Sequence, residues 1–298
     1  DGSGDYKALV IYNEASHFSA GANLGLALFA INVALWSQVE EFVAAGQRVF
    51  KALKFAPFPV VSAPSGMALG GGCEILLHSD HVQAHAETYT GLVEVGVGLV
   101  PGWGGCKEML LRFRAQEEQA YDKAMTSIGR EGERLWFSPK TSPMAAVRRA
   151  FETIGTATVA KSAAEAKAIG YFRDHDGITM NRDRLLYDAK MKALELAKDY
   201  TPPVARDDIR LPGASGKTAL NLAVEDLQKS GKATPYDVVV SDQLANVLTG
   251  GDKADITVEM SEDDILKLER DEFIRLLRQQ GTLDRIEHML DTGKPLRN

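Results

Sequence analysis

Hydrophobic residues in the first third of the chain form short runs of strand length, separated by segments with helical periodicity. Residues 8–12 are a continuous apolar run, which is typical of a strand buried on both faces. Over 37–54 the apolar positions recur at helical spacing, and prolines then end the helix before a short apolar pair at 60–61. Another strand is expected over 81–85. This alternation predicts an α/β fold with a mainly parallel sheet.

The pattern changes in the middle of the chain. Residues 113–143 mix charges with glycine and proline and show weak periodicity, so we expect a surface insertion there. Helical patterning returns over 144–153, 163–169 and 181–198. Beyond the Pro202–Pro203 pair the apolar spacing predicts helices only.

These C-terminal helices are expected over 217–229, 237–248 and 261–278, the last opening with a Ser261–Asp264 capping box. The sequence therefore predicts four parts. They are a core over 1–112, the insertion over 113–143, a helical end of the core domain over 144–199, and an all-helical C-terminal region over 200–298.

Composition excludes several classes of protein. Hydrophobic residues make up 45% and charged residues 25% of the 298 positions, which are values of a folded globular chain. A net charge of −7 argues against general nucleic-acid binding, and no apolar run is long enough for a membrane span. The chain has only Cys73 and Cys106, too few for a disulfide framework, so we expect a reducing, cytoplasmic location.

Two patterns could be mistaken for binding motifs. Residues 213–218 half-match a phosphate-binding loop around Lys217, but the first glycine and the preceding strand are missing, so a turn that starts a helix is favoured. The histidines His78, His81 and His85 invite a metal interpretation. On a strand they would point in different directions, so ordinary packing is favoured and no metal site is predicted.

Two glutamates are better candidates for chemistry. Glu74 lies one turn inside a helix that follows the glycine cluster 70–72, an arrangement that places backbone amides at a helix N-terminus. Glu94 lies among apolar neighbours in a second glycine-rich stretch. Burial raises the pKa of a carboxyl group toward neutrality, so a pair of this kind is suited to general acid–base catalysis.

Three motifs together resemble the crotonase superfamily, and within it the enoyl-CoA hydratases. They are Phe-Ser-Ala-Gly-Ala-Asn at 18–23, Gly-Met-Ala-Leu-Gly-Gly-Gly-Cys-Glu at 66–74, and Glu94 followed by Pro-Gly-Trp-Gly-Gly at 101–105. The resemblance implies a crotonase-like ββα spiral core. It also implies hydration of trans-2-enoyl-CoA in fatty-acid β-oxidation, with an acyl-CoA thioester as substrate and no cofactor.

The resemblance also implies roles for single residues. The backbone amides of Ala22 and Gly71 would form an oxyanion hole, and Glu74 and Glu94 would handle the water. Water- and substrate-binding positions would be Ala20, Leu99, Gly102 and Trp103. Asn23 stands where an aspartate is common, and either residue can cap the following helix.

Residues 292–298 are similar to the C-terminal region of bacterial 3-hydroxyacyl-CoA dehydrogenase/enoyl-CoA hydratase fusions. The NAD-binding G-x-G-x-x-G pattern is absent from this sequence, so NAD would belong to a dehydrogenase domain outside it. A strand–helix segment that the family carries before the position of Lys7 is also missing. We therefore expect the downstream part of a longer polypeptide, which forms homo-oligomers or contacts an upstream dehydrogenase domain. Alternatives are an enoyl-CoA isomerase of the same fold and a non-catalytic CoA-binding scaffold.

Overall fold

A computed structural model describes residues 6–127 and 142–298, which divide into two compact units. The first unit comprises Asp1–Glu94, Pro101–Gly105 and Ala157–Ala205, and the second comprises Val95–Val100, Cys106–Thr156 and Arg206–Asn298. The chain therefore passes between units several times, whereas the sequence pattern predicts four consecutive parts. Hydrophobic periodicity reveals elements along the chain but not which distant segments pack together.

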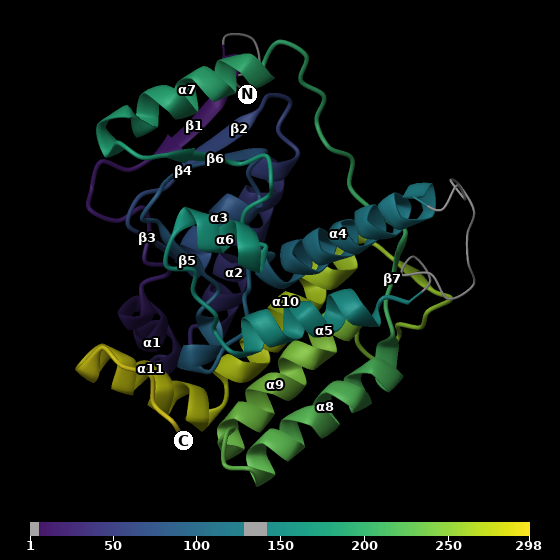
Figure 1. The fold of residues 1–298 in the computed structure, drawn as a ribbon. Helices are drawn as coiled ribbons and strands as arrows, with labels where there is room; N and C mark the ends of the chain where they lie inside the picture. Colours follow the sequence, from purple (N-terminus) through teal and green to yellow (C-terminus); the bar gives the residue numbers. More distant parts are fainter. Residues whose placement is uncertain (1–5, 128–141) are drawn as a thin grey trace. The chain divides into compact units, whose positions relative to one another are not determined.

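A parallel four-stranded sheet organises the first unit (Figure 1). Its order is β1 (Leu9–Tyr12), β2 (Val60–Ala63), β4 (His81–His85) and β6 (Gly177–Thr179). The register pairs Leu9 with Val60, Val61 with His81, and Gln83 with Gly177. The predicted α/β class with a mainly parallel sheet is confirmed.

Helix α7 (Leu185–Leu196) covers one face of this sheet (Figure 1). It follows a short 3-10 helix, η2 (Arg182–Arg184). Its buried residues Leu185, Ala189 and Ala193 recur every four positions and pack against Val61 and Ala63 of β2. This spacing places them on one side of the helix, which is the face that the strand can bury.

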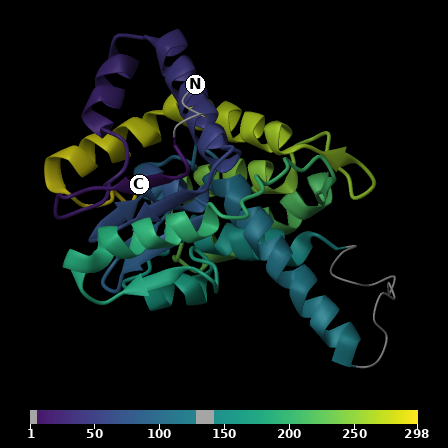
Figure 2. The same ribbon diagram turned by 90° about the horizontal axis from the view of Figure 1, so that it is seen from above.

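Smaller elements of the first unit surround the glycine-rich turns. A second parallel pair, β3 (Met67–Leu69) with β5 (Tyr89–Gly91), leads into helix α3 (Gly71–Leu77). Helix α6 (Ala163–Ile169) begins at the Ser162 cap and ends at Gly170, whose backbone is left-handed. Helices α1 (Leu24–Asn32) and α2 (Trp36–Lys54) form a helical hairpin, which Figure 2 shows clearly. As expected, the side chain of Asn23 caps α1 by accepting a hydrogen bond from the Leu26 amide at 3.1 Å.

The second unit is mostly helical. It contains most of α4 (Gly105–Ser127) and of η1 (Glu94–Val97), together with α5 (Met144–Gly155), α8 (Gly213–Lys229), α9 (Pro235–Thr249), α10 (Glu262–Leu277) and α11 (Gln280–Thr292). Helices α8 and α9 pack side by side (Figure 1). The predicted capping box at Ser261 and Asp264 is present at the start of α10, which confirms that prediction.

Two expectations for this unit are wrong in part. The segment expected to be an insertion from residue 113 is helical as far as Ser127, and its first residue belongs to the core, since Phe113 is fully buried and the Arg149 guanidinium lies over its ring at 4.2 Å. Residues 128–141 of the expected insertion lie outside the described residues. The C-terminal region is also not helical throughout, since β7 (Ile209–Arg210) and β8 (Glu259–Met260) form an antiparallel pair. Strands of two residues are too short to produce a periodic signal.

The half-matched phosphate loop is the first turn of α8, as expected. Gly213 has a φ of 59° and opens the helix, and a Cβ there would lie 1.9 Å from the Ala254 carbonyl oxygen. Lys217 forms an ion pair with Asp242 at 3.1 Å. None of the helices in the described ranges is both long and apolar enough to cross a membrane.

Candidate active site

The loop that carries Ala22 lies beside the glycine-rich start of α3. Ser19 hydrogen-bonds in both directions to β3, from its amide to the Met67 carbonyl and from the Leu69 amide to its own carbonyl, each at 2.9 Å. This pairing leads the chain to Gly21, whose φ of 92° favours glycine. A Cβ on Gly21 would lie 3.7 Å from the Gly71 nitrogen. The two amides expected to form an oxyanion hole therefore come from adjacent segments.

Gly71 opens α3 and has no room for a side chain. The preceding residue, Gly70, has a φ of 54°, and its amide donates to the Gly91 carbonyl at 2.9 Å. A Cβ on Gly71 would meet Cζ3 of Trp103 at 2.7 Å. A side chain at position 71 is therefore excluded by the indole ring that packs over it, as well as by the expected approach of a thioester.

Glu74 is held as a hydrogen-bond acceptor in a buried position. The residue is 2% exposed, and its Oε1 accepts hydrogen bonds from the amides of Trp103 and Gly105, both at 2.9 Å. Burial raises the pKa of the Glu74 carboxyl group, and the two amide bonds work against that rise. The turn that contains residues 101–105 thus supplies two donors that stabilise the ionised form of this carboxylate.

Glu94 occupies a different environment at the same glycine turn. A Cβ on Gly70 would lie 3.1 Å from Glu94 Oε1, while Glu94 Oε2 is buried without a hydrogen-bond partner among the described residues. Burial raises the pKa of the Glu94 carboxyl group and the nearby Glu74 charge raises it further, while hydrogen bonds from the Glu94 and Val93 backbone work against that rise. The arrangement therefore favours a proton on Glu94 and a negative charge on Glu74.

Helix α2 fixes the turn that donates to Glu74. Gln47 donates from its side-chain amide to the Gly102 carbonyl at 2.9 Å, in a buried position. The Trp103 ring stacks edge-on against Phe42 and Phe50, with centroid distances of 5.5 Å and 5.4 Å. A Cβ on Gly46 would lie 2.2 Å from Trp103 Nε1, so α2 also approaches this ring closely.

The sequence-based site residues fall into both units. Ala20, Ala22, Gly71, Glu74, Glu94, Gly102 and Trp103 belong to the first unit, and Leu99 is a buried residue of the second. Sequence reasoning missed the Gly105 amide and the Gln47 side chain. Gly105 is part of the 101–105 motif and could have been suspected on that ground, whereas nothing in the sequence around Gln47 marks it.

Comparison with known proteins agrees with this geometry. Residues 1–121 match the enoyl-CoA hydratase/isomerase family. The matched part includes the Ala22 loop, both glutamates and the turn at 101–105. This part of the chain is similar to the enoyl-CoA hydratase/isomerase family. The resemblance to the crotonase superfamily is thereby confirmed.

Solved structures of the family show the same fold. An enoyl-CoA hydratase from Rhodobacter sphaeroides aligns with all of this chain and 80% of its own, with a TM-score of 0.62 at 19% identity. An enoyl-CoA hydratase from Bacillus halodurans aligns with 94% of this chain and 80% of its own, with a TM-score of 0.53 at 15% identity. Identities this low establish the fold alone.

Curated relatives are much longer than this chain. A probable 3-hydroxyacyl-CoA dehydrogenase of Bacillus subtilis is 36% identical over 294 residues, which are 99% of this chain and 34% of that protein. A putative fatty acid oxidation complex trifunctional enzyme of Rickettsia felis is 29% identical over 283 residues, which are 95% of this chain and 33% of that protein. The chain therefore spans about a third of the length of these relatives.

The three histidines near the family motif serve separate purposes. His78 Nδ1 hydrogen-bonds the Glu74 carbonyl at 2.8 Å, and its ring stacks on Phe50. His85 Nδ1 accepts from the Glu87 amide at 3.4 Å. His81 lies beside His175 and Asp176, which belong to a later segment of the chain. The three histidines therefore have separate partners, and only His81 and His85 lie on a strand.

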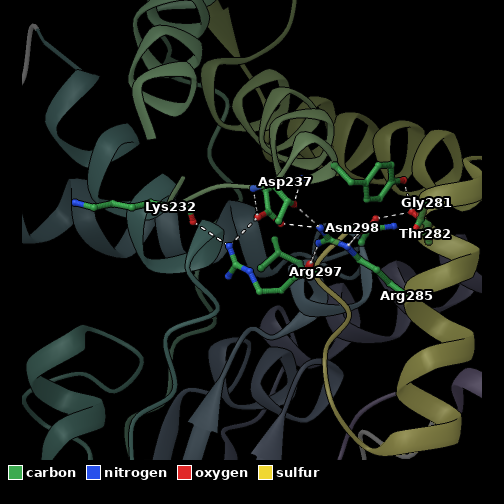
Figure 3. A network of polar contacts seen from close by, with 11 residues as sticks. Lys232, Asp237, Gly281, Thr282, Arg285, Arg297 and Asn298 are labelled. Carbon is green, nitrogen blue, oxygen red and sulfur yellow. Dashed lines mark hydrogen bonds and ion pairs between the residues drawn. The ribbon is translucent and has the colours of Figure 1, made fainter. Parts of the chain in front are cut away.

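The segment that follows Glu94 is anchored within the second unit by α11. Arg285 donates to the Val95 carbonyl at 3.1 Å, and Thr282 donates from its hydroxyl to the Gly98 carbonyl at 2.7 Å. Figure 3 shows Arg285 among its other partners, which include Asp237 at 2.7 Å and the Asn298 side chain at 2.8 Å. These bonds restrain the backbone of the residues directly after a candidate catalytic acid.

Proposed function

We propose that this chain catalyses the addition of water to the 2,3 double bond of trans-2-enoyl-CoA. The observation that carries this proposal is the unequal environment of the two carboxyl groups. Glu74 Oε1 accepts two backbone hydrogen bonds from the turn at 101–105, whereas Glu94 Oε2 is buried without a partner in the described structure and the Glu74 charge raises the pKa of Glu94. A hydratase needs one carboxylate to accept a proton and one carboxylic acid to donate one.

The thioester oxygen would be bound by the amides of Ala22 and Gly71. Negative charge develops on this oxygen when water adds to C3, because the intermediate is a thioester enolate. Two amide donors placed beforehand stabilise that charge without reorganising, and the start of α3 adds a partial positive charge. Loss of one donor of this type costs about 10²–10³ in rate.

The two glutamates would divide the proton transfers. Glu74 removes a proton from the water as the water oxygen bonds to C3, and the electron pair of the double bond moves into the enolate. Glu94 then donates its proton to C2, and the carbonyl is restored. Each addition leaves Glu74 protonated and Glu94 ionised, and proton transfer from Glu74 to Glu94 or exchange with solvent resets the pair.

The relatives support a place for this reaction in fatty-acid oxidation. One of them is named for a fatty acid oxidation complex and another for 3-hydroxyacyl-CoA dehydrogenase, whose named substrate is the product of the hydration. We therefore expect an acyl-CoA thioester as substrate, no cofactor for the hydration itself, and NAD bound by a dehydrogenase domain. Homo-oligomers or contact with that dehydrogenase domain are the expected assemblies.

The proposal is tested with crotonyl-CoA as substrate. Hydration is followed as loss of the enoyl-thioester absorbance, and 3-enoyl-CoA is offered in parallel. Loss of absorbance with crotonyl-CoA supports the hydratase. Conversion of 3-enoyl-CoA to 2-enoyl-CoA without hydration would identify an isomerase. Binding of acyl-CoA with no turnover of either substrate would identify a non-catalytic CoA-binding scaffold.

A further inference from the structure

A second cluster of polar side chains lies in the first unit at the start of strands β4 and β6. It consists of His81, His175 and Asp176, whose possible ligand atoms lie within 4.8 Å of one another. His81 Nδ1 is 3.7 Å from Asp176 Oδ1, and His175 Nε2 is 4.0 Å from the same oxygen. His81 and Asp176 are buried, and the His175 side chain is 62% exposed. The cluster therefore has two fixed members and one that reaches solvent.

The hydrogen bonds around His81 leave its Nδ1 as an unprotonated acceptor. Gln83 donates from its side-chain nitrogen to the Thr179 hydroxyl at 2.8 Å, which fixes its amide oxygen on the other side. That oxygen lies 3.4 Å from His81 Nε2 and can only accept, so Nε2 carries the proton of the neutral ring. Nδ1 then has a lone pair but no hydrogen-bond partner among the described residues.

Asp176 is held so that its carboxylate faces this nitrogen. Its two oxygens accept hydrogen bonds from the amides of Val82 at 2.9 Å and Arg173 at 2.6 Å. Each carboxylate oxygen retains a further lone pair. A buried lone pair on Nδ1 and a buried carboxylate oxygen repel each other unless a proton or a metal ion lies between them.

The separation of these atoms fits a metal ion better than a direct hydrogen bond. A direct N–H···O bond spans about 2.7–3.2 Å, which is shorter than the 3.7 Å observed. Two ligands of a tetrahedral zinc ion, each about 2.0–2.1 Å from the metal, are about 3.3–3.4 Å apart. His81 Nδ1 and Asp176 Oδ1 would have to move slightly closer, and the exposed His175 ring, whose Nε2 is 4.0 Å from that oxygen, would have to turn toward the ion.

We propose that His81, Asp176 and His175 form a binding site for a zinc ion, with water as the fourth ligand. Two imidazoles and a carboxylate are a ligand set that zinc prefers, and the backbone and Gln83 bonds supply the outer contacts that orient such ligands. Lys192 is the nearby cation that acts on His81, and it is bonded to Glu195 at 2.9 Å. The ion would fasten the start of β4 to the segment before β6. This role is independent of the hydration reaction.

The test uses the full chain, freed of metal with a chelator and dialysed. Zinc is titrated by calorimetry, and cobalt(II) is added separately because its visible spectrum distinguishes four-coordinate from hydrated ions. We expect one zinc ion per chain, intense four-coordinate cobalt bands, and a higher melting temperature with zinc. His175→Ala should weaken zinc binding at least ~10-fold and remove the thermal shift. His85→Ala alters a neighbouring β4 histidine outside the cluster and should bind like the unmodified chain.

Two results would overturn the proposal. One is the absence of zinc binding to a chain that is folded by circular dichroism. The other is equal affinity in the unmodified chain and His175→Ala, which would place the ion elsewhere. Because the His175 side chain is largely exposed, its loss should leave the metal-free melting temperature unchanged. Asp176→Asn is a second variant, since it keeps an oxygen for one backbone amide while removing the charge that binds the ion.

Discussion

The amide of Trp103 donates to Glu74 Oε1 at 2.9 Å, while the ring of the same tryptophan packs over Gly71. One residue therefore contacts both a candidate catalytic carboxylate and the candidate oxyanion amide. Movement of the turn at 101–105 would disturb both features together. The geometry of this turn is thus as important to the proposed chemistry as the two glutamates.

Replacement of either glutamate should remove most of the activity. Glu74→Gln and Glu94→Gln preserve size but cannot exchange protons, so each should lower kcat by ~10² or more with a smaller effect on KM. Glu87→Gln, which alters an exposed glutamate, is the matched control and should hydrate crotonyl-CoA at the normal rate. Near-normal kcat in either active-site variant would remove that residue from the mechanism.

The dependence of kcat/KM on pH should have two limbs. Burial and the Glu74 charge raise the pKa of Glu94 to about 8, so its essential proton is lost as the pH rises through that value. Burial raises the pKa of Glu74 to about 7, so its essential charge is lost as the pH falls through that value. Activity should be highest between the two, and initial rates across this range would show it. A flat profile would contradict the assigned protonation states.

Elements with strong local signals were predicted well from the sequence. Helix α6 has the expected bounds because Ser162 caps its start and the left-handed Gly170 ends it. Strand β4 also matches. The three-residue strands β3, β5 and β6 were missed because they are too short for a periodic pattern. Helix α11 was missed because it is amphipathic but strongly polar, and Gln279 before it makes no side-chain capping bond.

The candidate site could be predicted only as far as its motifs. The glycine cluster and the two glutamates are visible in the sequence, but the partners of Glu74 are not. Its amide donors lie 29 and 31 residues further along, and the Gln47 bond to Gly102 joins residues 55 apart. The cluster of His81 with His175 and Asp176 could not be predicted for the same reason, since it depends on the pairing of β4 with β6.

Gly71 should be coupled energetically to Trp103. A Cβ at Gly71 would meet the ring at 2.7 Å, so Gly71→Ala should lower the melting temperature and abolish turnover. Trp103→Ala in the same chain makes room, so the destabilisation of the two changes should be non-additive by about 1–3 kcal/mol in a double-mutant cycle. Turnover should stay low in the double variant because the Cβ at position 71 still lies beside the candidate oxyanion amide.

A glycine in an uncrowded position provides the control. A Cβ on Gly25 of α1 would meet only the Asn23 side-chain oxygen, at an ordinary 3.4 Å. Gly25→Ala should leave the melting temperature unchanged or raise it slightly, because alanine favours a helix. Equal effects of alanine at positions 71 and 25 would contradict the packing of Trp103 over Gly71.

Arg285 should influence turnover through the backbone that follows Glu94. Arg285→Leu removes the donor to the Val95 carbonyl, so kcat should fall about 10-fold or more as Glu94 loses its fixed position. Arg297 is the matched control. It shares the partner Asp237 at a longer distance of 3.6 Å, and its side chain is 65% exposed. Arg297→Leu should therefore retain normal kcat, and equal loss in both variants would indicate a general effect of the Asp237 ion pairs.

The most direct measurement of the proposed function is the fate of the water oxygen. Crotonyl-CoA is incubated with the chain in water enriched in a heavy oxygen isotope, and the CoA products are analysed by mass spectrometry. The hydratase mechanism predicts 3-hydroxybutyryl-CoA with one heavy oxygen on C3, formed at a rate that collapses in Glu74→Gln and Glu94→Gln. Recovery of crotonyl-CoA without labelled product, or labelled product formed equally fast by both variants, would contradict it.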